Sequence, residues 1–98
     1  MKNVNNERTE NETREQFIQR VYKDWIEINK PGDFRYGTNA GKLTAKEILN
    51  QIETKTKFGL EFVSLVGMRA LFYRNSSYNT IYSFINESMN RIKLFSSA

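Results

Sequence analysis

The chain has 98 residues, of which 39% are hydrophobic and 27% charged, and these values are typical of a single folded globular domain. Its 15 Lys and Arg residues outnumber its 11 Asp and Glu residues, which gives a formal net charge of +4. The sequence contains neither cysteine nor histidine, which excludes disulfides, thiolate zinc sites, cysteine nucleophiles and histidine acid–base chemistry. We therefore expect a protein that is not an enzyme and needs no metal or cofactor.

The polar N-terminal segment predicts a disordered tail over residues 1–12, followed by a single helical domain over residues 13–98. This segment lacks the apolar run of a signal peptide. The most apolar stretch, residues 58–73, is too short to span a bilayer and contains Glu61 and Arg69. We therefore expect a cytoplasmic protein with no membrane contact. Its Asn, Lys and Ile usage is typical of an AT-rich genome, such as that of a bacterium or a phage.

A first helix is expected over about residues 11–30. Apolar residues recur at helical spacing from Phe17 to Ile28, with charged residues between them. The helix is expected to start near Thr9 or Thr13, because both the segment 9–12, Thr-Glu-Asn-Glu, and the segment 13–16, Thr-Arg-Glu-Gln, fit a capping box. Pro31 predicts its end, because the residue before a proline disfavours helical geometry.

Residues 31–43 contain the only proline and three of the five glycines. This composition predicts a long Gly-rich loop, with a short extended piece at Phe34–Tyr36. A loop of this length in a small domain is often functional, so its exposed side chains are candidate binding residues.

A second helix is expected over residues 44–56. Thr44 and Glu47 have the spacing of a capping box. Ala45, Ile48 and Ile52 then fall on one face of the helix, which predicts that this face packs against the core.

A third helix is expected over residues 58–74. Between Phe58 and Tyr73 eleven of the sixteen residues are apolar, and they lie all around a helical wheel. Such a helix is expected to be buried on most sides, either by its own domain or by another subunit. Gly67 in its middle costs about 1 kcal/mol relative to alanine, which predicts close approach of a neighbouring helix.

A fourth helix is expected over residues 78–95, capped by Ser77 or Asn79. Its apolar seam has spacings of four and three residues and consists of Ile81, Ile85, Ser88, Ile92 and Phe95. Together these segments predict an all-α fold, a small bundle of about four helices.

The Gly-rich segment was compared with a phosphate-binding loop, which requires four residues between its glycines and a hydroxyl directly after its lysine. Here three residues separate Gly37 from Gly41, and Leu43 separates Lys42 from Thr44. Nucleotide hydrolysis is therefore rejected. A weaker possibility stays open, because the N–H groups of a helix that starts at Thr44 can hold an anion beside Lys42.

The first functional hypothesis is a non-enzymatic protein-interaction module, such as a small adaptor or inhibitor, that acts as a homo-oligomer. An apolar helix and a second apolar seam exceed what a small domain covers by itself. The candidate protein-binding residues, expected to be exposed, are Phe34, Arg35, Tyr36, Arg91 and Lys93.

The alternative hypothesis is binding of a nucleic acid or a small anion, such as a nucleotide or phosphate. It uses the basic residues of the loop and of the second helix, which are Arg35, Lys42, Lys46, Lys55 and Lys57. A helix-turn-helix is rejected, because the third helix would present apolar side chains to the base edges.

Overall fold

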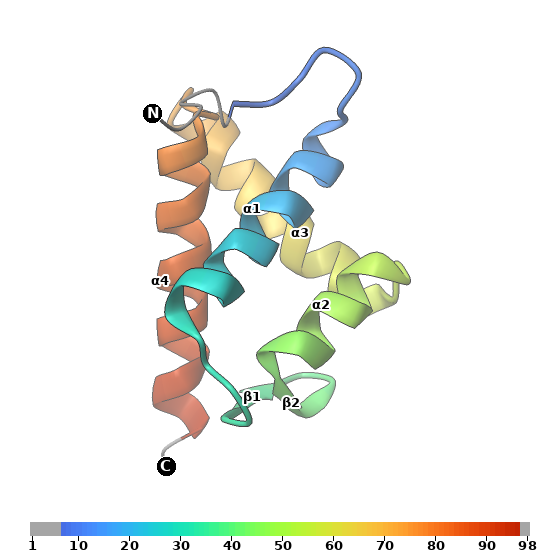
Figure 1. Ribbon diagram of the computed structural model, residues 1–98, viewed down its shortest axis with the longest axis vertical. Helices are drawn as coiled ribbons and strands as arrows, with labels where there is room; N and C mark the ends of the chain where they lie inside the picture. The colour runs from blue at the N-terminus through green and yellow to red at the C-terminus, as the bar shows by residue number, and fades with distance from the viewer. Residues whose placement is uncertain (1–6, 97–98) are drawn as a thin grey trace.

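The computed structural model describes residues 7–96 and shows four helices with one two-stranded sheet (Figure 1). In chain order the elements are α1 (Arg14–Asn29), β1 (Arg35–Thr38), β2 (Gly41–Thr44), α2 (Ala45–Glu53), α3 (Lys57–Phe72) and α4 (Tyr78–Ser96). The predicted small all-α bundle is confirmed, and each helix bound differs from its predicted position by at most three residues. Residues 1–6 of the predicted tail lie outside the described residues.

Helix α1 is central to the bundle because it packs against all three other helices. Figure 1 shows it crossing in front of α3, with α4 on one side and α2 on the other. Its inward side chains Phe17, Ile18, Val21 and Tyr22 are almost fully buried. The helical spacing of these residues places them on one stripe, and this stripe forms the middle of the core.

Hydrogen-bonded caps fix where the helices begin. The predicted capping boxes at Thr13 and Thr44 are confirmed: Thr13 Oγ1 accepts from the Gln16 N–H at 3.0 Å, and Thr44 Oγ1 accepts from the Glu47 N–H at 3.1 Å. In each box the side chain of the third helical residue accepts from the cap's own N–H in return. The alternative start at Thr9 is wrong, because α1 begins at Arg14. The N-cap of α3 is Thr56, so this helix begins slightly earlier than the apolar pattern predicts.

The extended piece predicted at Phe34–Tyr36 within the segment 31–43 overlaps β1, but the second strand that pairs with it was not predicted. The second half of this segment forms an antiparallel hairpin that pairs Arg35 with Thr44 and Thr38 with Gly41. Gly41 has a φ of 105°, which a glycine adopts without the strain of a side chain. The Thr38 hydroxyl also donates to the Gly41 carbonyl at 2.6 Å and closes the turn. The glycines therefore shape a tight turn between two short strands.

Aromatic side chains with satisfied polar atoms join the elements in the core. The Tyr22 hydroxyl donates to the Ala45 carbonyl at 2.9 Å, and the Tyr22 ring meets the Phe62 ring edge-on at 5.6 Å. Burial raises the pKa of Tyr22, so its hydroxyl stays protonated and remains a donor. Trp25 Nε1 donates to Asn86 Oδ1 at 3.0 Å, which links α1 to α4.

Two glycines mark close approaches of α3 to its neighbours. A Cβ at Gly67 would lie 3.3 Å from Arg14 Nε and 3.6 Å from Ile18 Cδ1, so the predicted close approach of a helix is confirmed and the helix is α1. Gly59 lies closer still to a neighbour. A Cβ there would overlap the backbone carbonyl of Gln51, and this contact fixes the tight turn between α2 and α3.

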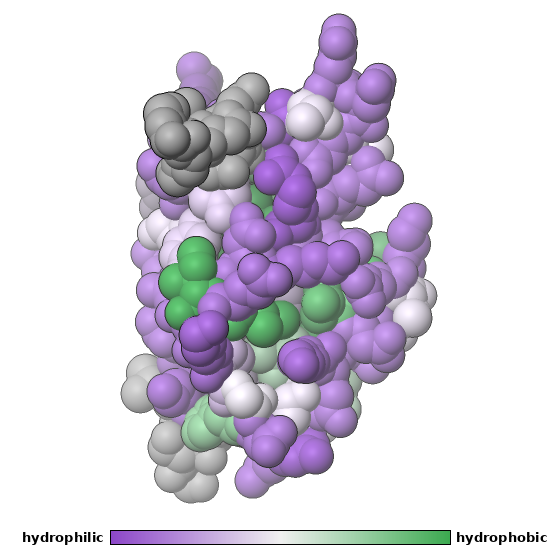
Figure 2. Space-filling view, viewed as in Figure 1, coloured by the Kyte–Doolittle hydropathy of each residue, from purple (hydrophilic) through white to green (hydrophobic). Residues whose placement is uncertain are grey.

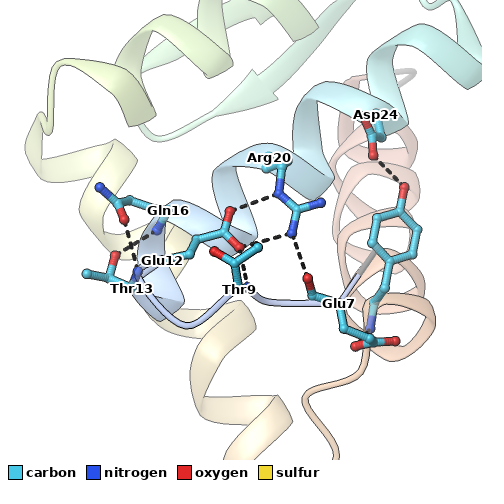
Figure 3. A network of polar contacts seen from close by, with 8 residues as sticks. Glu7, Thr9, Glu12, Thr13, Gln16, Arg20 and Asp24 are labelled. Atoms are coloured by element: carbon cyan, nitrogen blue, oxygen red, sulfur yellow. Dashed lines mark hydrogen bonds and ion pairs between the residues drawn. The ribbon is translucent and has the colours of Figure 1, made fainter. Parts of the chain in front are cut away.

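Residues 7–12 make polar contacts with α1 and with the start of α4 (Figure 3). Arg20 Nε donates to Glu12 Oε2 at 2.8 Å, and Arg20 Nη2 donates to the Glu7 carbonyl at 3.2 Å. The Glu7 carboxylate accepts from the Tyr78 N–H at 2.9 Å, while the Tyr78 hydroxyl donates to Asp24 at 2.6 Å. The hydrogen bond from Arg20 lowers the pKa of the Glu12 carboxyl below its ordinary value.

Candidate protein-interaction surface

One side of α3 is apolar and exposed. Phe62, Val63, Val66 and Ala70 point into the core, as an amphipathic helix requires. The opposite side, hereafter the α3 face, consists of Leu60, Glu61, Ser64, Leu65, Met68, Leu71 and Phe72, all of them exposed. The expectation that this helix is buried on most sides by its own domain is therefore wrong. Burial by another subunit is the alternative that remains.

Exposed large apolar side chains are concentrated at α3. Within the described part of the chain there are eight, and six of them lie between Leu60 and Tyr73. The most exposed is Phe72 at 79%, followed by Leu65 and Met68 at about 60%. At about 100 Å² for each, the five of them that belong to the α3 face present roughly 500 Å² of apolar surface, which lies in the upper part of the range for the largest patch on a monomer. These five are Leu60, Leu65, Met68, Leu71 and Phe72. Figure 2 shows that the side on which α1 lies is mainly hydrophilic.

A hollow of about 290 Å³ adjoins the α3 face. It lies where α3, α4 and the hairpin meet, and its walls are formed by Gly37, Thr38, Asn39, Phe58, Glu61, Phe62, Leu65, Ser88, Arg91 and Ile92. The floor is mainly apolar, whereas Glu61 and Arg91 place one carboxylate and one guanidinium at its walls. A hollow of this kind accepts a ring or a branched side chain of a partner.

Among the predicted protein-binding residues, the structure brings Phe34 and Lys93 into contact. Phe34 is 39% exposed, and Lys93 Nζ lies 5.3 Å from the centre of its ring, a cation–π contact between the hairpin and α4. Arg91, two residues earlier on α4, lines the hollow. Arg35 is exposed but pairs with Glu47 at 3.2 Å.

Tyr36 is the exception among these predicted residues, because its side chain is only 4% exposed. The expectation that it is exposed is wrong. Successive side chains of a strand point to opposite sides, so Arg35 faces solvent while Tyr36 enters the core. Its ring also packs edge-on against Phe34 at 4.8 Å. Tyr36 therefore holds the hairpin against the helices.

The lysines of the alternative hypothesis are exposed but point to different surroundings. Lys46 borders a depression formed with the end of α1, whereas Lys55 borders one that contains Glu15. Lys57 lies beside the hairpin turn and Glu61. These three lysines therefore belong to separate surface depressions, each of which also holds a carboxylate, and do not form one basic surface.

The start of α2 is already occupied by the chain's own groups. Glu47 Oε1 accepts from the Thr44 N–H at 2.8 Å and from Arg35 Nη1 at 3.2 Å. Arg35 also donates to the carbonyl of Lys42 at 3.1 Å. A bound anion would have to displace the Glu47 carboxylate from the position where a helix N-terminus attracts negative charge.

The exposed residues of α3 were not among the predicted site residues. The signal that identifies them is present in the sequence: Leu65, Met68 and Phe72 follow Glu61 at intervals of four, three and four residues. This spacing is typical of a helix that packs along another helix. This stripe is difficult to recognise in the sequence because apolar residues lie all around the helix, so that its inward and outward sides have the same composition.

Comparisons with models of protein families, with curated proteins and with solved structures gave no match. Among the helices between residues 7 and 96, none has both the length and the apolar character needed to cross a membrane. The functional argument therefore depends on the chemistry of the surface itself, above all on the α3 face and the hollow beside it.

Proposed function

We propose that this protein is a non-enzymatic protein-interaction module, an adaptor or an inhibitor that works by docking another polypeptide on the α3 face. The observation that carries this proposal is the exposure of three large apolar side chains, Leu65, Met68 and Phe72, at helix-packing spacing on one side of a single helix. Contiguous apolar surface of this size is costly in water and marks interaction sites.

The size and the chemistry of the surface support the same proposal. The apolar surface of roughly 500 Å² is more than half of the roughly 800 Å² that each partner contributes to a standard protein–protein interface. Two of its members, Phe72 and Met68, belong to residue types that are enriched at protein–protein interfaces. Glu61 is the one ionisable group of the α3 face, so the face offers docking rather than acid–base chemistry.

Photo-crosslinking tests the proposal. A photoreactive amino acid is placed at Met68, in the middle of the α3 face, and in a matched variant at Lys46, which is exposed on α2. Both variants are expressed at the natural level in cells that normally make the protein. We expect covalent adducts with a polypeptide from Met68 and not from Lys46. Equal adducts at both positions, or none at Met68, would contradict the proposal.

A further inference from the structure

The α3 face and the hollow beside it are complementary to each other in shape. Phe72 is the most exposed large apolar side chain among the described residues. The hollow has the size for such a ring, and two of its walls, Glu61 and Leu65, come from the same helix as Phe72. One copy of the chain therefore carries both a knob, which is the Phe72 ring, and a hole, which is the hollow beside Glu61 and Leu65, along the same helix.

The helix geometry places knob and hole on one line. Phe72 follows Glu61 by eleven residues and Leu65 by seven, and at about 100° per residue both intervals return to within about 20° of the same side of the helix. The knob and the hole are separated along the helix by about 16 Å, at 1.5 Å per residue. Because a helical side chain leans towards the N-terminus of its helix, the Phe72 ring is slightly nearer to the hollow than its Cα.

An antiparallel pair of α3 helices related by a twofold axis uses both features at once. With the axis between Leu65 and Met68, each of these residues lies opposite the other in the second copy. Phe72 then lies opposite Glu61 and enters the partner's hollow, beside Arg91. The guanidinium of Arg91 supplies a cation for the face of the incoming ring. Each contact occurs twice, as an isologous interface requires.

Charge also favours this orientation over a parallel pair. The antiparallel arrangement keeps the two Glu61 carboxylates about 16 Å apart, whereas a parallel pair would put them side by side. It also sets the two helix dipoles in opposite directions, which is the favourable arrangement. About 500 Å² from each copy gives roughly 1,000 Å² in total, which reaches the size expected of a small biological interface.

We propose that the occupant of the α3 face is a second copy of this chain, joined by antiparallel α3 helices with Phe72 of each copy in the hollow of the other. This inference rests on the proposed function, because it names the polypeptide that docks there. An interface of this size gives a dimer that forms and dissociates with protein concentration.

Sedimentation equilibrium from low-micromolar to near-millimolar protein tests this proposal. The variants are Phe72→Ser and the matched control Ile28→Ser, which removes an apolar side chain that is 63% exposed on α1. Since Phe72 is 79% exposed, its removal leaves the fold intact, and circular dichroism checks this. We expect a monomer–dimer equilibrium whose dissociation constant rises about tenfold or more in Phe72→Ser and changes less than about twofold in Ile28→Ser.

The orientation has its own test, because a chain without cysteine accepts single cysteines cleanly. A short bis-maleimide linker is expected to join Met68→Cys to its copy, since these positions lie near the twofold axis. It is expected not to join Lys57→Cys, whose two copies are about 28 Å apart along the pair. Crosslinking at both positions would overturn the antiparallel arrangement.

Failure of the dimer and failure of the proposed function give different results. A protein that stays monomeric at every concentration, while Met68 still forms adducts with a different polypeptide in cells, overturns the dimer and leaves the interaction module. A dimer that Phe72→Ser does not weaken also overturns the proposed contact. Absence of polypeptide adducts at Met68 together with a monomer overturns both.

Discussion

Replacing Gly59 with alanine is predicted to destabilise the fold strongly. The new Cβ would overlap the Gln51 carbonyl and come within 2.8 Å of Ile52 Cα. Both are backbone atoms, so no change of rotamer relieves the clash, and α3 must move away from α2. Alanine gains about 1 kcal/mol of helix propensity over glycine, whereas overpacking of this kind costs about 3 kcal/mol or more. The net loss is about 2 kcal/mol, a fall of roughly 10 °C in Tm for a domain of this size.

The matched variant is Gly67→Ala in the same helix. Its nearest neighbour is Arg14 Nε at 3.3 Å, on a long side chain that can shift. The propensity gain therefore prevails, and we expect a stabilisation of about 0.5 kcal/mol. Urea unfolding followed by far-ultraviolet circular dichroism at low protein concentration measures both variants. A Gly59→Ala free energy of unfolding within about 0.5 kcal/mol of the parent chain would refute the packing argument.

Three further predictions concern the core, acid stability and nucleic acid. Tyr22→Phe removes the side-chain donor to the Ala45 carbonyl, which keeps its hydrogen bond within α2, and is expected to lower the free energy of unfolding by about 0.5–1.5 kcal/mol; an unchanged urea midpoint would contradict this role. Because Arg20 lowers the pKa of Glu12 in the folded state, the ion pair between them raises the free energy of unfolding above the ordinary glutamate pKa. This stabilisation is lost as pH falls through the lowered pKa of Glu12. Glu12→Gln should therefore flatten the acid side of the stability–pH curve, and an unaltered curve would count against the ion pair. Anisotropy titrations with single-stranded DNA, duplex DNA and RNA are expected to show no binding that survives physiological salt; salt-resistant binding would favour the alternative hypothesis.

The helices could be predicted from the sequence because their signals are local. A capping box involves residues three apart, and an amphipathic stripe repeats within two turns, so both are visible without knowledge of the fold. The boxes at Thr13 and Thr44 and the close approach at Gly67 were predicted in this way and are confirmed. Gly59 was missed as a contact, because its neighbour Gln51 belongs to the preceding helix.

The hairpin could not be predicted with the same certainty. Its strands have four residues each and are rich in polar residues and glycine, which gives little alternation to recognise. The burial of Tyr36 depends on its packing against the helices, above all α4, a contact between segments far apart in the sequence. The second strand and the burial of Tyr36 were therefore missed for the same reason.

The position of the exposed apolar surface could not be predicted from the sequence. Composition and the excess of apolar helix surface favour the hypothesis of a binding protein, which stays a proposal. Which side of α3 remains uncovered depends on where α1, α2 and α4 pack, because Val66 and Leu65 are equivalent to a sequence pattern. The basic residues lie close together along the chain, which suggested a single basic surface. The fold instead places Lys46, Lys55 and Lys57 in separate surface depressions.

Oxidation of methionine measures most directly whether a polypeptide covers the α3 face. Met68, at the centre of this face, is 61% exposed, while Met89 is fully buried and serves as an internal reference. Dilute purified protein and cells that naturally make the protein are treated with hydrogen peroxide, and mass spectrometry compares Met68 sulfoxide in the two. We predict rapid oxidation of Met68 in the dilute protein and marked protection in cells, with Met89 slow in both. Equal oxidation of Met68 in the two settings would contradict the claim that this face is a docking surface.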